Sequence, residues 1–458
     1  MASRSIGKLR KYRWKELGLL VIPFIILLLG MTQLLLVDGN ATTFSVKSLP
    51  TLQGLIPILG LIGVLVGTNI LFSFFFPKAD QFLLPLVGLL SGIGVLMALR
   101  LGPDVGDPSA GTRQLAWVIL GLFICIGTLF GLRKMSWLSR YKYTWAFLGI
   151  ILVMFTLVNA LRVKNFNSPT HDQLNFGPFN LQPSELLKIF IVIFFAAYLS
   201  ENRDIIAQGN LRIGPLRLPP LRQLGPIALM LSIALLLFLG VRELGLALLI
   251  YGIFLSMLYL GSGKLSYIIG GLLIFIVLGF IGYKLFGYVR DRFTVLGIDV
   301  VNWSPASDAI YKTSAFQIVQ GLIALASGGI FGAGLGLGHP YFVPVVQTDF
   351  IFTALGEELG LAGLFAIIGL YLLILYRGYR IAIEASNPFN QLLAAGLTSI
   401  FAIQSLIIIA VNMKFLPTTG IPLPFLSYGG SSIIANYIII GILLRISHNT
   451  ALEREGLA

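Results

Sequence analysis

Twelve apolar segments are long enough, or nearly so, to cross a membrane, and this pattern constrains the fold more than any other feature of the chain. Crossing ~30 Å of hydrocarbon takes about 20 residues of α-helix. The segments cover approximately residues 17–37, 53–76, 82–100, 114–131, 143–160, 185–200, 225–240, 243–260, 266–286, 349–375, 391–411 and 429–445. The sequence therefore predicts an all-α polytopic membrane protein with about 12 transmembrane helices. A β-barrel would instead show short segments of alternating hydrophobicity.

Composition supports this class and excludes an ordinary soluble domain, because 57% of the residues are hydrophobic, 11% are charged and the mean hydropathy is +0.90. The first apolar segment is too long for a signal peptide and lacks a small-residue cleavage site, so we expect a retained anchor. The single cysteine, Cys125, excludes a disulfide framework, and His171, His339 and His448 show no metal-ligand spacing. The residues by themselves predict no metal site.

The net charge of +13 would suit nucleic acid, but the basic residues cluster in loops beside the apolar segments. That distribution is typical of topology signals and of attraction to anionic membrane lipids. If the N-terminus is cytoplasmic, the inner loops hold 20 of the 32 lysines and arginines. The positive-inside rule therefore predicts that both termini are cytoplasmic and that residues 161–184 and 287–348 lie outside.

Three carboxylates lie within ten residues at the outer end of one apolar segment, in the stretches 348–352 (Thr-Asp-Phe-Ile-Phe) and 356–360 (Gly-Glu-Glu-Leu-Gly). Because hydrocarbon solvates charge poorly, an acid in such a place usually faces a water-filled cavity or a substrate. Asp349 is therefore the first candidate for chemistry. Glu357 and Glu358 lie one helical turn or more deeper, and we interpret them as structural or cavity-lining.

The outer segment 287–348 is too long to be a passive connection, which indicates a function. It opens with the charged patch around Arg290 and carries Gln317 and Gln320 on a stretch of helical periodicity. It then becomes rich in glycine over 328–338, without the spacing of a nucleotide-binding loop. We expect these glycines to form a tight backbone at the membrane surface.

A second polar cluster, residues 182–188 (Gln-Pro-Ser-Glu-Leu-Leu-Lys), begins another apolar segment. Proline suits the first turn of a helix, and Glu185 there favours the positive end of the helix dipole. Glu185 and Lys188 are three residues apart, so they share a helix face and can pair. Two readings stay open: a capped helix start with an ion pair, or a polar patch in which Lys188 meets a phosphate.

A third cluster, residues 415–432, contains three prolines and paired glycines and cannot form a regular helix. Irregular backbone at membrane depth is tolerated only where protein or a cavity surrounds it. The cluster therefore predicts a broken helix near a site. Arg242-Glu243 reads as the charged end of a hairpin between two segments, or as a further part of that cavity.

In this order, the motifs resemble the SEDS family (shape, elongation, division and sporulation), the group of RodA and FtsW. The QPSE-x-x-K motif stands at 182–188, the paired glutamines with GG-x-x-G-x-G at 317–338, the TDFIF and EE-x-G motifs at 348–360, and P-x-x-G-x-P-x-P-x-x-S-Y-G-G-S at 417–431. A weaker likeness reaches back to about residue 80. The resemblance implies a ten-helix core at 79–448, an extension of two helices at 1–78 and a cytoplasmic tail at 449–458.

Three positions depart from the family pattern. Members often carry Pro-Glu shortly before the Asp of TDFIF, where this chain has Pro344-Val345 and so lacks one acid. The Asp usual before Leu-Gly is Glu243 here, and residues 171–175 replace the segment with glycine and tryptophan that usually precedes QPSE. Val345 bears most directly on whether the chain matches the family in catalysis.

The resemblance implies a peptidoglycan glycosyltransferase that polymerises lipid II at the outer face of the bacterial cytoplasmic membrane, with a class B penicillin-binding protein as partner. Asp349 would be the general base in an inverting transfer from an undecaprenyl-pyrophosphate-linked glycan. Lys188, Arg290 or a divalent cation such as Mg²⁺ or Mn²⁺ would balance the pyrophosphate. The remaining predicted substrate-binding residues are Gln182, Ser184, Glu185, Gln317, Gln320, Thr348, Ser427, Gly429, Gly430 and Ser431.

Two other functions fit parts of the sequence. Many spans with midplane charges and broken helices also describe a lipid II flippase or another transporter. Against this, no inverted repeat is evident, and the acids concentrate at one face instead of along a path. A non-catalytic scaffold for a cell-wall synthase is the third reading, favoured by Val345 and opposed by the intact TDFIF motif.

Overall fold

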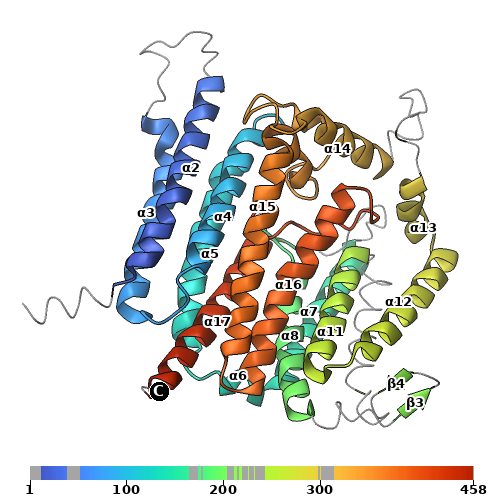
Figure 1. Cartoon of the computed structure of the whole chain (residues 1–458). Helices are drawn as coiled ribbons and strands as arrows, with labels where there is room; N and C mark the ends of the chain where they lie inside the picture. Colours follow the sequence, from blue (N-terminus) through green and yellow to red (C-terminus); the bar gives the residue numbers. More distant parts are fainter. Residues whose placement is uncertain are drawn as a thin grey trace, which may run out of the picture. The chain divides into compact units, whose positions relative to one another are not determined.

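The protein is mostly α-helical in the computed structural model (Figure 1). The structure describes residues 12–38, 52–163, 174–176, 179–203, 211–213, 216–218, 225, 232, 243–297, 300 and 314–456. Within these residues, ten helices are long and apolar enough to cross a membrane. They are α2 (Trp14–Asp38), α3 (Leu52–Phe75), α4 (Leu83–Leu101), α5 (Ala110–Gly131), α8 (Pro183–Glu201), α11 (Leu244–Ser262), α12 (Leu265–Leu285), α15 (Ile351–Glu384), α16 (Pro388–Asn412) and α17 (Gly430–Arg454).

These helices confirm a multi-pass membrane protein. Of the two remaining predicted spans, 143–160 coincides with helix α7 (Lys142–Val163), whereas 225–240 lies almost wholly outside the described residues. A total of twelve spans therefore stays a prediction. The cytoplasmic location of both termini stays a prediction as well, because it rests on charge distribution alone.

Two short hairpins depart from the all-α expectation. Strand β1 (Leu174–Phe176) pairs antiparallel with β2 (Phe179–Leu181), and β3 (Leu211–Ile213) pairs in the same way with β4 (Leu216–Leu218). Each strand has three residues, which is too short for the alternating pattern that reveals a strand in a sequence. The first hairpin lies in the connection between α7 and α8.

The chain forms two compact units, which are interleaved in sequence. The first unit, called the Asp349 unit below, contains residues 1–133, 320–377 and 422–458. The second, called the Lys188 unit, contains residues 134–319 and 378–421. The proposed division into an extension, a core and a tail is a separate matter of sequence and stays a prediction.

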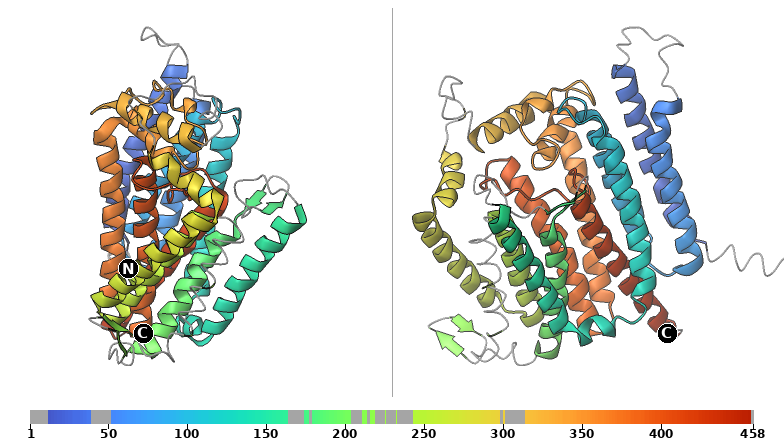
Figure 2. Two further views of the ribbon diagram at one scale, coloured as in Figure 1. Left: turned by 90° about the vertical axis from the view of Figure 1, so that its right-hand side faces the viewer. Right: turned by 180° about the vertical axis from the view of Figure 1, so that it is seen from behind.

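In the Asp349 unit, α2 and α3 run side by side and both contact α4, as Figure 1 and the right-hand view of Figure 2 show. Helix α2 buries Leu20, Leu27 and Met31 on one face and exposes other apolar side chains such as Ile22 and Leu29. A helix that is apolar all round suits hydrocarbon on its outer face. Helix α5 packs against α3, α4 and α17.

A buried arginine holds the N-terminal helices together. Arg13 donates from Nε and Nη2 to the two carboxylate oxygens of Glu16, at 2.6 and 2.9 Å, and also to the carbonyl oxygens of Phe76 and Asp80. Asn69 on α3 donates to the same carboxylate at 2.8 Å. Arg13 is one of the basic residues near the N-terminus that the positive-inside rule assigns to the inner face, but it is only 1% exposed and its side chain ties α2 to the chain that follows α3.

In the Lys188 unit, α8 is the most enclosed helix and packs against α7, α11 and α16. Its side chains are buried on nearly every face, so it is surrounded by protein instead of lipid. Helix α12 is the opposite case, because it exposes apolar side chains such as Leu272, Ile276 and Phe280 along most of its length. Such a surface is stable only in contact with hydrocarbon or a partner.

Candidate active site

Asp349 lies in a turn immediately before α15. The predicted span began at Asp349 itself, but the helix begins at Ile351, so the carboxylate stands outside the helix and not in its first turn. The backbone N–H groups of Thr348 and Asp349 both donate to the carbonyl oxygen of Val345, each at 3.2 Å. The Asp349 side chain is half-buried, which leaves it partly accessible.

The proline-rich segment before α17 holds this turn through two hydrogen bonds. Ser427 donates from Oγ to the carbonyl oxygen of Thr348 at 2.5 Å, and the Tyr428 N–H donates to the carbonyl oxygen of Gln347 at 2.8 Å. The same Ser427 hydroxyl accepts the N–H of Leu423 at 2.8 Å. The two motifs at 348–360 and 417–431, which are far apart in sequence, are therefore joined at Asp349. The sequence predicts no regular helix over 415–432, and this is confirmed up to Gly429, whereas residues 430–432 form the first turn of α17.

Gln114 on α5 fixes the same segment from the other side. Its side-chain amide donates to the carbonyl oxygen of Ser427 at 3.1 Å and accepts the N–H of Gly429 at 3.3 Å. Beside it, a Cβ on Gly430 would come within 2.4 Å of the Trp117 ring, so this position needs glycine. Gln114 was not among the predicted site residues; the sequence shows only a glutamine at the start of an apolar run, and the structure shows that it is fully buried and hydrogen-bonded.

Tyr428 places a phenol beside this segment. The Arg113 guanidinium lies over its ring, 5.9 Å from the centroid, and Arg113 also pairs with Asp107. Burial raises the pKa of Tyr428, against the lowering effect of Arg113. The phenol therefore stays protonated at neutral pH and remains a hydrogen-bond donor.

The glycine-rich stretch packs tightly against a break in α15. Gly360 interrupts this helix with a φ of 68°, and a Cβ there would lie 2.2 Å from the backbone nitrogen of Gly332. The N–H groups of Ala333 and Gly334 donate to the carbonyl oxygens of Glu357 and Glu358, at 2.9 and 3.0 Å. The predicted tight backbone is present, and its reason is this backbone-to-backbone contact with α15.

The two glutamates beyond Asp349 are engaged with protein. Oε1 of Glu357 accepts the backbone N–H of His339 at 2.7 Å. Oε1 of Glu358 lies 3.2 Å from Nε of Arg100 on α4, and the Glu358 side chain is fully buried. These contacts support the structural reading of both residues and leave Asp349 as the accessible carboxylate of the three.

Val345, which stands where family members often have glutamate, has an uncommon backbone conformation. Its φ is 57°, in the left-handed region that a β-branched side chain adopts at a cost of about 1–2 kcal/mol. This conformation turns its carbonyl oxygen toward the N–H groups of Thr348 and Asp349. The side chain itself is 52% exposed, so packing does not explain the choice of residue.

In the Lys188 unit, the motif at 182–188 starts α8 as predicted, with Pro183 in the first turn. The predicted pairing of Glu185 with Lys188 is confirmed by a 2.7 Å hydrogen bond from Nζ to Oε2. Nζ also donates to Oε1 of Gln404 on α16 at 2.9 Å. All three side chains are buried, and Lys188 is fully inaccessible. A substrate phosphate would reach Lys188 only if this cluster opened.

The predicted site residues are divided between the two units. In the Asp349 unit lie Gln320, Thr348, Asp349, Ser427, Gly429, Gly430 and Ser431. In the Lys188 unit lie Gln182, Ser184, Glu185, Lys188, Arg290 and Gln317. Arg290 is exposed on α13 (Gly287–Thr294), whose neighbouring Arg292 donates to the carbonyl oxygen of Thr418 at 3.0 Å. The two glutamines occupy α14 (Ser314–Gly328), and both are half-buried.

Over the described ranges, no group of three or more His, Cys, Asp or Glu side chains is arranged to hold a metal ion. Asp349 is the accessible acid of its turn, and Glu185 is already engaged by Lys188. The described residues therefore do not form a protein-built metal site.

The amino-acid sequence is similar to known proteins. The profile of the FtsW, RodA and SpoVE family, described as cell cycle protein, matches residues 80–452. Peptidoglycan glycosyltransferase RodA of Mycobacterium leprae is 37% identical over 382 residues, which are 82% of this chain and 79% of that protein. Probable peptidoglycan glycosyltransferase FtsW of Nitrosomonas europaea is 31% identical over 397 residues, 83% of this chain and 96% of that protein.

Solved structures share the fold. A chain from the work titled "Structural coordination of polymerization and crosslinking by a peptidoglycan synthase complex" has a TM-score of 0.63 at 23% identity, covering 81% of this chain and 98% of that chain. Rod shape determining protein RodA of Thermus thermophilus has a TM-score of 0.56 at 23% identity, covering 81% and 97%. The resemblance drawn from the four motifs is confirmed, and so is the predicted class of enzyme at the level of its named relatives.

Proposed function

Since the chain belongs to the FtsW, RodA and SpoVE family of cell cycle proteins, we propose that it polymerises lipid II into glycan strands. The reaction takes place at the outer face of the bacterial cytoplasmic membrane, where the distribution of lysine and arginine puts the Asp349 turn. The RodA relatives are the more similar of the two kinds described above, which favours a role in elongation over one in division.

In the proposed reaction, Asp349 is the general base. It takes the proton from the 4-hydroxyl of the acceptor's N-acetylglucosamine as that oxygen attacks the anomeric carbon of the growing glycan. The bond from this carbon to the pyrophosphate oxygen breaks, undecaprenyl pyrophosphate leaves, and the anomeric configuration inverts. An inverting transfer needs a base on the acceptor side, whereas a diphosphate leaves without much acid assistance.

The single observation that carries the assignment is how the Asp349 turn is held. Both carbonyl groups before Asp349, those of Gln347 and Thr348, are fixed by the segment 427–428, and Phe350 after it is buried. The carboxylate is left half-buried at the end of a rigid support. A base needs this combination, because the rate depends on its position to within about 1 Å and on access to the substrate.

Charge on the pyrophosphate needs cationic partners. Arg290 is exposed and available for this role, whereas Lys188 acts at close range only after its contacts with Glu185 and Gln404 open. Gln182, Ser184, Gln317, Gln320 and the residues of the 427–431 segment complete the proposed substrate contacts. Mg²⁺ or Mn²⁺ would enter with the substrate's phosphates, since the described residues provide no site for it.

The proposed partner is a class B penicillin-binding protein that cross-links the new strand. The solved complex with the same fold is described as one that coordinates polymerisation with cross-linking, which supports such a partnership. A transpeptidase next to the polymerase would receive the strand as it leaves the site.

Polymerisation of labelled lipid II by the purified protein tests this proposal, with and without the partner synthase. Asp349→Asn should reduce strand synthesis by about 10²–10⁴-fold, the usual contribution of a general base. Asp104→Asn is the matched control, because it removes another accessible carboxylate of the same unit, one that pairs with Arg100.

The outcomes separate the functions. Strands from the wild type and the control, but not from Asp349→Asn, would support the assignment. Equal product from all three would remove Asp349 as the base and turn attention to Glu185. No strands from any protein in the presence of the partner, with lipid II translocation in liposomes, would favour a transporter; with neither activity, a scaffold would remain.

A further inference from the structure

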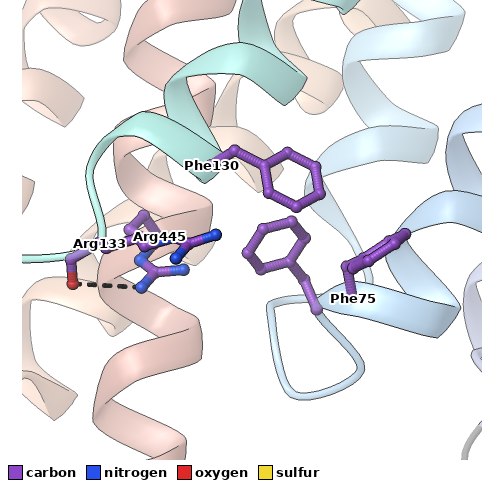
Figure 3. A pocket seen from close by; sticks show the side chains of 5 residues that line it. Phe75, Phe130, Arg133 and Arg445 are labelled. Atoms are coloured by element: carbon purple, nitrogen blue, oxygen red, sulfur yellow. Dashed lines mark hydrogen bonds between the residues drawn. The ribbon is translucent and has the colours of Figure 1, made fainter.

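A pocket of about 250 Å³ lies between α3, α5 and α17 in the Asp349 unit. Its lining consists of Phe75, Phe76, Phe130, Arg133 and Arg445. Figure 3 shows the two arginines on one side and Phe75 and Phe130 on the other. The volume is just below the ~300–1,000 Å³ of sites that enclose a drug-sized ligand. It therefore suits a headgroup and not a whole lipid.

The two arginines of this pocket differ from four other arginines of the same unit. Arg13, Arg100, Arg113 and Arg377 each pair with a carboxylate. Within the part of the chain that the structure describes, neither Arg133 nor Arg445 has an acidic partner, and Arg445 uses one donor on the carbonyl oxygen of Arg133 at 3.2 Å. Two guanidinium groups that share a pocket repel each other unless an anion lies between them. Phosphate fits best, because guanidinium groups bind it through paired donors.

The phenylalanines of the pocket indicate that the phosphate belongs to a lipid. Phe75 is 59% exposed and contacts Phe130 edge to face, at 5.2 Å between centroids. The Arg445 guanidinium lies 5.7 Å from the centroid of the buried Phe76 ring, a cation–π contact that holds it at the pocket. An exposed phenyl ring beside two cations offers an acyl chain an apolar surface next to the site for its headgroup. Inorganic phosphate has no apolar part that could contact that surface.

The location agrees with a lipid. Arg133 follows the last turn of α5, and Arg445 lies in α17 at the end of the predicted span. The charge distribution puts these ends at the inner face of the membrane, where anionic headgroups concentrate. Phe75 and Phe76 precede residue 80, where the family match begins, so the pocket depends on the N-terminal extension.

We infer that this pocket binds the phosphate of an anionic membrane lipid, with the two arginines on the phosphate and Phe75 along an acyl chain. The extension thereby gives the protein a lipid site that the family core alone would lack. The site is remote in sequence from Asp349 and does not depend on the proposed reaction, so each can fail without the other.

Native mass spectrometry of the full-length protein in detergent, titrated with phosphatidylglycerol, tests the inference. A detergent micelle lacks the surface potential of a charged vesicle. A lipid that stays bound to the protein in detergent therefore occupies a defined site. Arg133→Gln and Arg445→Gln should each weaken the tightest phosphatidylglycerol adduct about tenfold, as expected for a charge-assisted hydrogen bond. Arg454→Gln is the matched control, since it removes an exposed arginine from the same helix, α17. Phe75→Ala should weaken the binding of phosphatidylglycerol but not the binding of inorganic phosphate.

The melting temperature without added lipid identifies variants that fail to fold. If Arg445→Gln does not fold, the lipid affinity of Arg133→Gln tests the inference, because the Arg133 side chain is exposed and its loss should not disturb packing. Phosphatidylcholine should bind no more tightly to the wild type than to the arginine variants. Unchanged phosphatidylglycerol binding in Arg133→Gln and Phe75→Ala would overturn the inference. Inorganic phosphate that binds as tightly as phosphatidylglycerol would overturn the choice of a lipid.

Discussion

The turn of Asp349 and the cluster around Lys188 both place charge at the start of a membrane helix, and they treat it differently. Lys188 is fully buried, and its Nζ is bonded to Glu185 and Gln404. Asp349 is half-buried, while its backbone is held by Ser427 and Tyr428. In the first case the protein immobilises the charge itself, and in the second it immobilises the support and leaves the carboxylate accessible.

This difference separates a charge that stabilises a helix contact from one that can react. A buried ion pair has already lost its water, and removing one partner leaves the other uncompensated. A partly exposed acid on a rigid support keeps enough solvation to ionise and enough access to take a proton. We therefore expect changes at Lys188 to appear first in stability, and changes around Asp349 to appear first in the rate.

The largest effect on stability should come from Lys188→Met. It leaves the Glu185 carboxylate buried without its cation, which typically costs about 3–5 kcal/mol. Thermal unfolding in detergent, followed by tryptophan fluorescence, measures the loss. Combining Lys188→Met with Glu185→Leu should recover more than half of it, since an apolar pair replaces an ion pair at little cost.

Lys142→Met provides the control for that experiment. Lys142 also pairs with a glutamate in the same unit, but its partner Glu201 is 54% exposed. A pair with one exposed partner contributes about 0–1 kcal/mol, so this variant should unfold nearly as the wild type does. A Lys188→Met protein that unfolds normally yet makes no glycan would reverse the comparison and make Lys188 a substrate contact.

Ser427→Ala should have a smaller effect, on rate and stability together. It removes the hydroxyl that links Leu423 to the carbonyl oxygen of Thr348, and leaving such buried groups unsatisfied costs about 1–3 kcal/mol. Polymerisation should fall about tenfold, because the support of Asp349 loosens and misplacement lowers the rate.

Ser405→Ala is the matched substitution, a buried serine whose hydroxyl donates to a carbonyl oxygen within its own helix. It should change polymerisation less than twofold to threefold, because no contact with the Asp349 turn is lost. Equal rates for the two serine variants would show that the 427–428 contacts do not position the base.

Much of this fold can be predicted from the sequence, because apolar runs and side-chain spacing within one helix are local features. The apolar runs locate the helices, since hydrocarbon demands about 20 apolar residues per crossing. Helices α15 and α17 both continue nine residues beyond their predicted spans, because a helix can extend past the apolar run. The Glu185–Lys188 pair also follows from local spacing, at i and i+3 on one helix. The same spacing joins Arg13 to Glu16, but Arg13 stands among many basic residues near the N-terminus, where the sequence indicates a topology signal and not an ion pair.

What escaped prediction depends on packing between distant segments. Gln404 is 216 residues from Lys188, and Ser427 is 79 residues from Thr348, so no periodicity connects them. Gln114 reads as one polar residue in an apolar helix until the fold brings it to Ser427. The motifs indicated which stretches carry the site, but not which backbone groups meet there.

The smallest predicted effect concerns Val345 and the strain in the Asp349 turn. Asparagine adopts the left-handed conformation more readily than valine does, so Val345→Asn should stabilise the protein by about 1 kcal/mol. The turn should keep its geometry, because it depends on the Val345 carbonyl oxygen and not on the side chain, and polymerisation should stay within about threefold of the wild type. Val105→Asn, at another exposed valine of the same unit without a positive φ, should leave the melting temperature nearly unchanged. A lower melting temperature for Val345→Asn than for Val105→Asn would mean that valine is not strained at position 345.

A gain in stability together with a large loss of polymerisation would instead mean that the strained backbone at position 345 helps to position Asp349.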